Sequence, residues 1–523
     1  MSVILACSSP SVDAVSPQPN STMDSSGVIP CAAPEQRAAE GPLYRPALPT
    51  DGREVESSPS GCGGSLADLD ADGFLDILWV CRGDVALLMG DASGFVEETS
   101  ARGLAPLDYA VASSVIDLED DGDLDVLLMS RVEPDVLYRN DGTGSFTLDP
   151  DSGLTTEALA STGAVWNDGD LDGDLDLFIS GHDNIPWTPD DPTAAKASQL
   201  YENDGGVLID RSDRIPQDAH DGHTFLASWM DLNGDTLPDL YLVNDHGWLS
   251  QPNHLLVSTG DLHFELDHSN HGLELPIAGM GLGIGDLNGD LWPDFMLPQW
   301  GLTVVESDSM GGWYYTGGIR GLNVETNLAA WGTELADMDN DGDLDAVVVF
   351  GHLAVSGERE NPEKQPDMLF ELRSGLFEEV AADWGFNDPG QGRGLAVADL
   401  NRDGFLDVFV GMLDGVPRLH LSRCDDSAWL TVRLQQPAPN RSAIGATVEA
   451  ITDDGHQIRW MMAGGTGLFS SNPAEAHFGL GDADAVELRV TWPDGAIDTW
   501  TSIEARQHVL LTRGTSTSRA DGR

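Results

Sequence analysis

A nine-residue acidic segment recurs along this chain and constrains its fold more than any other feature. In its clearest copy, carboxylates stand at positions 1, 3, 5 and 9 of the run Asp337 to Asp345, and Gly342 stands at position 6. Carboxylates at this spacing form an oxygen cage of the size and charge that Ca²⁺ requires, and glycine permits the sharp turn at position 6. The β-branched residues that follow position 9 predict that the segment joins two strands rather than two helices.

The segment occurs seven times, which predicts seven calcium loops. The copies start 49 to 63 residues apart, a repeat length typical of a propeller blade made of about four short strands. The predicted metal ligands are, loop by loop, Asp68, Asp70, Asp72 and Asp76; Asp117, Glu119, Asp121 and Asp125; Asp168, Asp170, Asp172 and Asp176; Asp231, Asn233, Asp235 and Asp239; Asp286, Asn288, Asp290 and Asp294; Asp337, Asp339, Asp341 and Asp345; Asp399, Asn401, Asp403 and Asp407.

Loops four and five depart from this pattern, because Thr236 and Leu291 stand where the other five loops have glycine. β-branched and bulky residues rarely adopt a positive φ. These two loops also carry a proline at position 8. We therefore expect them to use another turn or to remain without metal, and the sequence predicts five to seven calcium ions in total.

The segments between the loops read as strands throughout. Apolar runs such as Val126 to Met129 follow the loops, and the Asn-Asp-Gly turn at 140–142 marks a hairpin. We predict an all-β fold with a seven-bladed propeller over residues 41–424 and a small antiparallel β-sandwich over residues 425–513. Residues 1–40 read as a signal remnant with a flexible linker, and residues 514–523 read as a disordered tail.

Blade seven lacks a fourth strand in this reading. Its strands are expected near 395–398, 408–410 and 418–421, after which the chain leaves for the sandwich. Residues 42–57 precede the first strand of blade one, so we expect them to supply the missing outer strand and to close the ring.

The charge balance limits the partners that this chain can have. The formal charge is −62, with 88 acidic side chains, which argues against nucleic acid or an anionic membrane surface. No apolar run approaches the roughly 18 residues of a membrane-spanning helix. Ile4, Leu5 and Ala6 before Cys7 resemble a bacterial lipobox, so Cys7 is either a lipid anchor, the only membrane attachment we expect, or an ordinary thiol.

The remaining cysteines suggest two disulfides. Cys62 and Cys81 fall on neighbouring antiparallel strands of the first blade, where a disulfide is sterically reasonable. Cys31 could reach Cys424 if the N-terminus folds back onto the last blade. Free buried thiols are the alternative.

A second set of residues follows the second strand of each blade, on the face opposite the calcium loops. Propellers commonly bind ligands near their central channel, which this face would border. The alternative is a set of solvated strand ends. The possible ligand face comprises Arg82, Arg131, His182, His246, Trp300 and His352.

Several motifs carry a family resemblance. The repeats between about 42 and 424 resemble FG-GAP/VCBS repeats. Ile444-Gly445-Ala446, Gly464-Gly465, Phe478-Gly479-Leu480-Gly481 and Trp492-Pro493-Asp494-Gly495 resemble, in order and spacing, the ASPIC/UnbV domain of the cartilage acidic protein and UnbV family. Ser470-Ser471-Asn472 departs from the Ser-x-Ser-Gln run expected there. The resemblance implies an extracytoplasmic calcium-binding propeller, either secreted or a cell-envelope lipoprotein.

Two functions follow as hypotheses. The first is a non-catalytic, calcium-stabilised binding, adhesion or scaffold module whose ligand is a protein or carbohydrate at the cell surface. The second is an enzyme or a natural-product biosynthesis accessory that uses a pocket on the possible ligand face. A transition metal on His182, His246 and His352 would support the second hypothesis, whereas calcium alone would support the first. A surface-layer component is a third, purely structural reading.

Overall fold

The computed structural model describes residues 61–521, apart from gaps at 183–194, 221, 270, 323, 325–326, 353–363, 388, 414, 423–425 and 454. Within these residues, seven antiparallel sheets follow one another along the chain. Their strands are β1 (Cys62–Ala67), β2 (Asp76–Cys81), β3 (Asp84–Asp91) and β4 (Gly94–Glu97); β5 (Ala110–Ile116), β6 (Asp125–Ser130), β7 (Val136–Asn140) and β8 (Phe146–Leu148); β9 (Ser161–Asn167), β10 (Asp176–Gly181), β11 (Gln199–Asp204) and β12 (Val207–Asp210); β13 (Thr224–Met230), β14 (Asp239–Asn244), β15 (His254–Gly260) and β16 (His263–Leu266); β17 (Gly283–Gly285), β18 (Asp294–Gln299), β19 (Gly301–Ser307) and β20 (Trp313–Tyr315); β21 (Ala330–Ala336), β22 (Asp345–Phe350), β24 (Met368–Arg373) and β25 (Leu376–Glu379); β27 (Gly392–Ala398), β28 (Asp407–Met412) and β29 (Arg418–His420).

The first strands of these sheets line the centre of a ring. Strand β1 packs against both β5 and β27, so the last sheet lies next to the first. Cys62 and Leu66 of β1 share one hydrophobic cluster with Ala396 and Phe409 of the last sheet. The predicted all-β propeller is therefore confirmed. The last sheet has three strands in the described residues, and the closing strand expected from residues 42–57 lies outside them and stays a prediction.

Position 9 of the acidic loops holds each blade together. Asp76 has no exposed surface. Its Oδ2 accepts a hydrogen bond from the backbone N–H of Leu69 at 2.8 Å, and its Oδ1 accepts one from the N–H of Gly90 at 2.7 Å. Asp239 makes the same pair of bonds with Leu232 and Ser258, at 3.0 and 2.8 Å. One carboxylate thus joins the start of the loop to the third strand, which explains why an aspartate recurs there.

Helices contribute little to this fold. Those in the described residues are the short η2 (Ser212–Arg214), η3 (Gln217–Ala219) and α2 (Ala381–Trp384), and no described helix is long and apolar enough to cross a membrane. A two-stranded pair, β23 (Gln365–Pro366) with β26 (Pro389–Gly390), completes the propeller.

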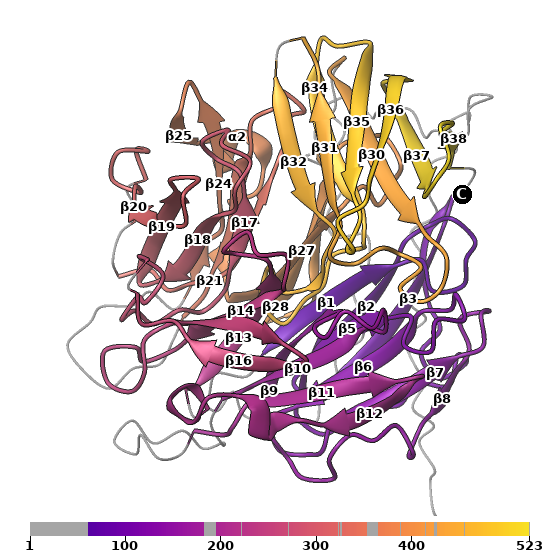
Figure 1. The fold of residues 1–523 in the computed structure, drawn as a ribbon, viewed down its shortest axis with the longest axis vertical. Helices are drawn as coiled ribbons and strands as arrows, with labels where there is room; N and C mark the ends of the chain where they lie inside the picture. Colours follow the sequence, from indigo (N-terminus) through magenta and orange to yellow (C-terminus); the bar gives the residue numbers. More distant parts are fainter. Residues whose placement is uncertain are drawn as a thin grey trace, which may run out of the picture.

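The C-terminal domain is a β-sandwich of two four-stranded sheets, ordered β34-β30-β37-β38 and β32-β31-β35-β36. Figure 1 shows it, in yellow and light orange, standing on one side of the ring. Its strands are β30 (Ala428–Gln435), β31 (Thr447–Ile451), β32 (His456–Trp460), β33 (Ala463–Gly464), β34 (Ala476–Gly481), β35 (Ala485–Thr491), β36 (Ile497–Glu504), β37 (Gln507–Thr512) and β38 (Arg519–Ala520).

Two expectations about this domain need correction. The sandwich is not purely antiparallel, because β30 and β37 pair in parallel. The tail is not disordered over residues 514–521, because β38 pairs with β37 and Arg433 Nη1 donates to Asp521 Oδ2 at 3.0 Å. A long-range pairing register and a tertiary ion pair leave no local signal in the sequence, which is why neither feature was predicted.

Residues 461–474 leave the sandwich and enter the central channel of the propeller; we call them the channel segment. Strand β33 adds to the inner edge of β9, where Ala463 pairs with Trp166. Single β-bridges then join Gly467 to Leu282, Leu468 to Leu395 and Ser471 to Ser65. Four of the seven sheets therefore hold this segment at their inner edges. Side chains of the C-terminal domain, rather than an open channel, fill the axis of the ring.

Cys62 and Cys81 form a disulfide, and they are direct partners in the register of β1 and β2 with Cα atoms 4.1 Å apart. This confirms the first predicted pair; Cys31 and Cys424 lie outside the described residues.

Cys81→Ser is expected to lower the free energy of unfolding by about 2–4 kcal/mol, because the bond restricts the unfolded chain. Urea unfolding of the variant measures this loss. Native protein in which both thiols react with an alkylating agent would contradict the pairing.

Candidate metal centres

The carboxylates of three acidic loops converge as a metal site requires. In loops one, three and six, one oxygen from each of positions 1, 3 and 9 lies within 4.8 Å of the others. Hard oxygen donors at this density are what Ca²⁺ takes in proteins. The converging residues are Asp68, Asp70 and Asp76; Asp168, Asp170 and Asp176; and Asp337, Asp339 and Asp345.

Burial and mutual repulsion strain these carboxylates as long as they carry their charges without a counterion. Desolvation, with added repulsion from Asp70 and Asp68, raises the pKa of Asp76 to about 8. Desolvation likewise raises the pKa of Asp337 to about 8, although Arg459 opposes the shift. A divalent cation would compensate both effects, because it supplies the opposite charge at the point where the oxygens meet.

Loops four and five use the same turn as the others, so the expectation of a different turn was wrong. Thr236 and Leu291 have φ values of 75° and 68°. Their backbone N–H groups donate to the position-1 carboxylates of Asp231 and Asp286, both at 2.9 Å. Gly342 makes the equivalent bond in loop six at 2.9 Å. The framework around the loop thus imposes the left-handed conformation even on side chains that disfavour it.

Loop two contains an internal cation that sequence reasoning missed. Arg139, on β7, directs Nη1 to Glu119 and, at 3.1 Å, to Asp125. Its Nε donates to Asp149 at 2.9 Å. A guanidinium therefore lies among the predicted ligands of this loop. The only sequence signal was the pairing of a longer acid, Glu119, with an arginine on the third strand.

The C-terminal domain rests directly on loops six and seven. His477 Nε2 lies 2.8 Å from Asn340 Oδ1, and the N–H of Gly481 donates to the carbonyl of Asn340 at 2.9 Å. Gly479 between them abuts the metal loop, since a Cβ on it would lie 2.1 Å from Asp337 Oδ2. On loop seven, His508 Nε2 lies 3.2 Å from Asp399 Oδ2. The geometry of the loops therefore determines how this domain is seated.

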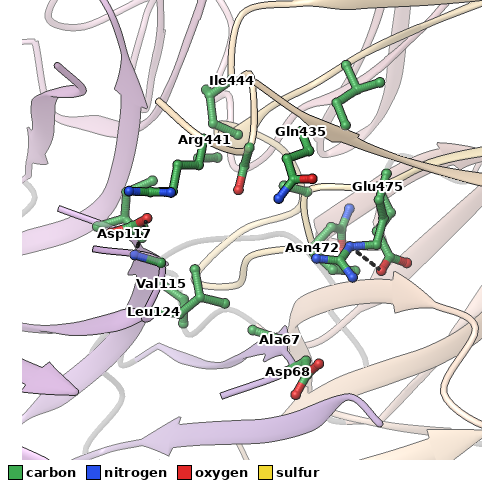
Figure 2. Close-up of a pocket in the computed structure, with 18 of the residues that line it drawn as sticks. Ala67, Asp68, Val115, Asp117, Leu124, Gln435, Arg441, Ile444, Asn472 and Glu475 are labelled. Carbon is green, nitrogen blue, oxygen red and sulfur yellow. Dashed lines mark hydrogen bonds and ion pairs between the residues drawn. The ribbon is translucent and has the colours of Figure 1, made fainter. Parts of the chain in front are cut away.

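A cleft opens where the domain bridges loops one and two. It has a volume of 260 Å³, and Asp68 and Asp117 line its propeller side. Figure 2 shows Arg441 reaching across it towards Asp117 from the sandwich. The Nε of Arg441 donates to the carbonyl of Asp120 at 3.0 Å, so this arginine ties the sandwich to loop two.

Three members of the possible ligand face come together on neighbouring blades. Arg131 Nη2 lies 3.4 Å from His182 Nδ1, and Asp245 Oδ2 lies 3.0 Å from His246 Nε2 and 3.7 Å from His182 Nε2. His223, which sequence reasoning missed, packs edge-on against both histidines with ring centroids 5.6 Å away. The other three members, Arg82, Trp300 and His352, belong to blades one, five and six.

The channel segment is held by a buried acid, Glu334. Its Oε1 accepts a hydrogen bond from Asn472 Nδ2 at 2.9 Å, and Asn472 Oδ1 in turn accepts one from the N–H of Val397 at 2.8 Å. Asn472 occupies the place where a glutamine was expected, and it joins two blades. Desolvation raises the pKa of Glu334 from 4.5 to about 8, although hydrogen bonds from Thr466 and Asn472 oppose the shift.

This shift predicts a pH dependence. The folded pKa lies above the unfolded one, so the contribution of Glu334 to stability is complete below the unfolded pKa and lost as the pH rises through about 8. Between those values the loss is about 1.4 kcal/mol per pH unit. Glu334→Gln keeps an acceptor for Asn472 and should remove the part of the pH dependence of the free energy of unfolding that comes from Glu334. Urea unfolding at pH 6 and pH 8 measures this change in the free energy of unfolding. An identical change in wild type and variant would contradict the raised pKa of Glu334.

Comparison with known proteins agrees with the geometry. Residues 68–128 match the model of the FG-GAP-like repeat, and residues 436–518 match that of ASPIC and UnbV. The chain therefore contains an FG-GAP-like repeat and, towards its C-terminus, an ASPIC/UnbV domain. The sandwich described above, with its channel segment, is that ASPIC/UnbV domain.

Cartilage acidic protein 1 is similar to this chain in sequence. The Xenopus tropicalis protein is 27% identical over 286 residues, which cover 52% of this chain and 42% of that protein. The Mus musculus protein is 27% identical over 269 residues, covering 49% and 40%. The chain thus matches less than half the length of these curated relatives.

Two solved structures resemble part of this chain at low sequence identity. An Agrocybe aegerita lectin that recognises non-reducing terminal N-acetylglucosamine is 14% identical, with a TM-score of 0.41, covering 68% of this chain and 87% of that one. BBS1N, in complex with ARL6DN, is 9% identical, with a TM-score of 0.41, covering 70% of this chain and 93% of that one.

Proposed function

We propose that this chain is a calcium-stabilised, extracytoplasmic binding module. In this proposal the propeller is a rigid base, and bound calcium fixes the loops on which the ASPIC/UnbV domain is seated. The observation that carries the proposal is the convergence of three carboxylates in each of loops one, three and six. The ligand would be a protein or carbohydrate at the cell surface.

Calcium suits these sites better than other metals. Their donors are carboxylate oxygens without a thiolate or imidazole in the set, which disfavours zinc and copper. Ca²⁺ accepts irregular sets of six to eight oxygens, whereas Mg²⁺ demands a near-ideal octahedron. The remaining ligands would come from position 5, backbone carbonyls and water.

The disulfide and the charge support an extracytoplasmic location. A bond such as Cys62–Cys81 persists in oxidising compartments and is rare in the cytosol. The formal charge of −62 keeps such a protein soluble and away from polyanions. Lipid anchoring through Cys7 remains part of the proposal, since that residue lies outside the described ones.

A variant pair in loop six tests the calcium sites. Asp339→Ala removes one converging carboxylate, whereas Asp343→Ala changes an exposed aspartate of the same loop that is not in the converging set. In calcium titrations followed by calorimetry, Asp339→Ala should bind about one ion fewer than wild type, and Asp343→Ala should bind the same number. Equal stoichiometry in all three proteins would argue against loop six as a calcium site.

A further inference from the structure

Loops four and five differ from the other acidic loops in a way that metal binding does not require. Thr236 and Leu291 adopt positive φ values of 75° and 68°, a conformation in which glycine would be free of strain. The other five loops place their one strained side chain at position 4 instead, as Leu171 does at a φ of 64°, where loops four and five have Gly234 and Gly289. Thr236 and Leu291 both line one cleft between these loops and the ASPIC/UnbV domain.

We call this space, of 260 Å³, the aromatic cleft. The propeller contributes Thr236, Leu291 and Trp292, and the domain contributes Trp460, Thr447 and Thr491. The last three form a row across the sheet, because Trp460 and Thr491 both pair with Thr447 on the intervening strand. Neighbours in such a row present their side chains on the same face. The cleft therefore offers one indole and two hydroxyls from a rigid sheet.

Trp292 and Trp460 are both half-buried. The ring of Trp292 lies across loop four, where a Cβ on Gly234 would be 3.3 Å from its Cη2. Two further tryptophans of the cleft are buried and use their N–H groups internally: Trp229 donates to the carbonyl of Pro238 at 3.1 Å, and Trp492 donates to Asp498 at 2.9 Å. Among the residues that the structure describes, no hydrogen bond engages the N–H of Trp292 or Trp460. Trp460 packs partly against a hydrophobic cluster of the propeller, but both rings keep exposed surface and an N–H donor.

The charge around the cleft selects the ligand. The chain as a whole has a formal charge of −62, which seven divalent ions would reduce but not cancel, so an anionic ligand would be repelled. A neutral sugar ring has an apolar C–H face, which suits the electron-rich face of an indole, and a rim of hydroxyls, which suits threonine, indole N–H and carboxylate groups. Clefts at domain interfaces with a few convergent polar groups are common ligand sites.

We propose that the aromatic cleft binds a neutral carbohydrate, with sugar rings stacked on Trp292 and Trp460. The inference rests on the proposed role as a binding module and assigns the ligand class and its place. Because loops four and five carry their glycine at position 4, the side chains of Thr236 and Leu291 at position 6 contribute to the lining of the cleft.

The test uses the full chain in calcium on an array of neutral and sulfated oligosaccharides. Wild type should retain neutral members, and titration with the best of them should show about tenfold weaker binding for Trp292→Ala and for Trp460→Ala. Trp248→Ala, at a tryptophan that is 53% exposed outside the cleft, is the matched control and should bind as wild type does. Calcium titration of the same proteins reports separately on the metal proposal.

Several results would overturn the inference. One is that wild type retains no neutral sugar on the array, and another is that it prefers the sulfated members. A third is that wild type and both cleft variants bind the sugar with equal affinity. Competition by a decaproline peptide that depends on Trp292 would identify a proline-rich peptide site instead, because aromatic grooves also take such helices. A wild type that binds sugar but not calcium would remove the metal proposal and leave the aromatic cleft in place.

Discussion

Chelation of calcium with EGTA is expected to lower the free energy of unfolding by on the order of 7–10 kcal/mol. With site affinities of about 10⁻⁴ M and calcium at about 10⁻³ M, each site contributes about 1.4 kcal/mol by mass action. Five to seven occupied sites give the total. The unfolded chain lacks the loop geometry, so it does not share this binding energy.

Thermal melts in excess calcium and in excess EGTA, both at moderate salt, measure this effect. Magnesium in place of calcium is the control, because a general screening of the acidic surface would stabilise the protein equally in both salts. The melting temperature should fall substantially in EGTA and should recover on adding calcium back. An unchanged melt in EGTA would exclude calcium as a structural component.

Phe469→Ala is expected to lower the free energy of unfolding by about 3–5 kcal/mol, the usual cost of removing a buried phenylalanine. Phe469 lies in the channel segment and is 1% exposed. Its ring meets Phe225 edge-on, with centroids 6.1 Å apart. A cavity at this point would loosen contacts to several blades at once, because their inner strands converge there.

Leu148→Ala is a suitable control, since Leu148 is a hydrophobic residue that is 47% exposed. It should change the free energy by less than about 0.5 kcal/mol. Urea denaturation of both variants and wild type in calcium gives the comparison. An equal loss of unfolding free energy in the two variants would mean that the burial of Phe469 in the channel segment does not stabilise the ring.

The local part of this architecture could be predicted from sequence. The run from Val126 to Met129 was expected as a strand, and β6 spans Asp125–Ser130. This prediction was possible because the acidic loop and the apolar run that follows it are consecutive in the sequence. The disulfide followed in the same way from two strands that are neighbours in the chain.

Features that depend on residues far apart could not be predicted. Gly464 was recognised only as part of a motif, yet a Cβ there would lie 2.2 Å from the carbonyl oxygen of Ala164. Its role comes from contact with a strand about 300 positions away. Thr236 and Leu291 likewise contradict their own preferences, because the surrounding framework overrides local propensity. The position of Arg139 among the ligands of loop two required the third strand to be placed in space.

The channel segment also sets an order for folding. Ribosomes and export machinery deliver a chain from its N-terminus, so all seven blades emerge before residues 461–474. Until then, Phe225 and Trp331, whose rings are 6.2 Å apart on the axis of the ring, face an unfilled core. The blades can pair their strands early, but the propeller reaches its final packing only when the last tenth or so of the polypeptide has arrived. A truncated translation product would therefore expose the apolar axis of the ring, and quality-control proteases could distinguish it from the complete chain.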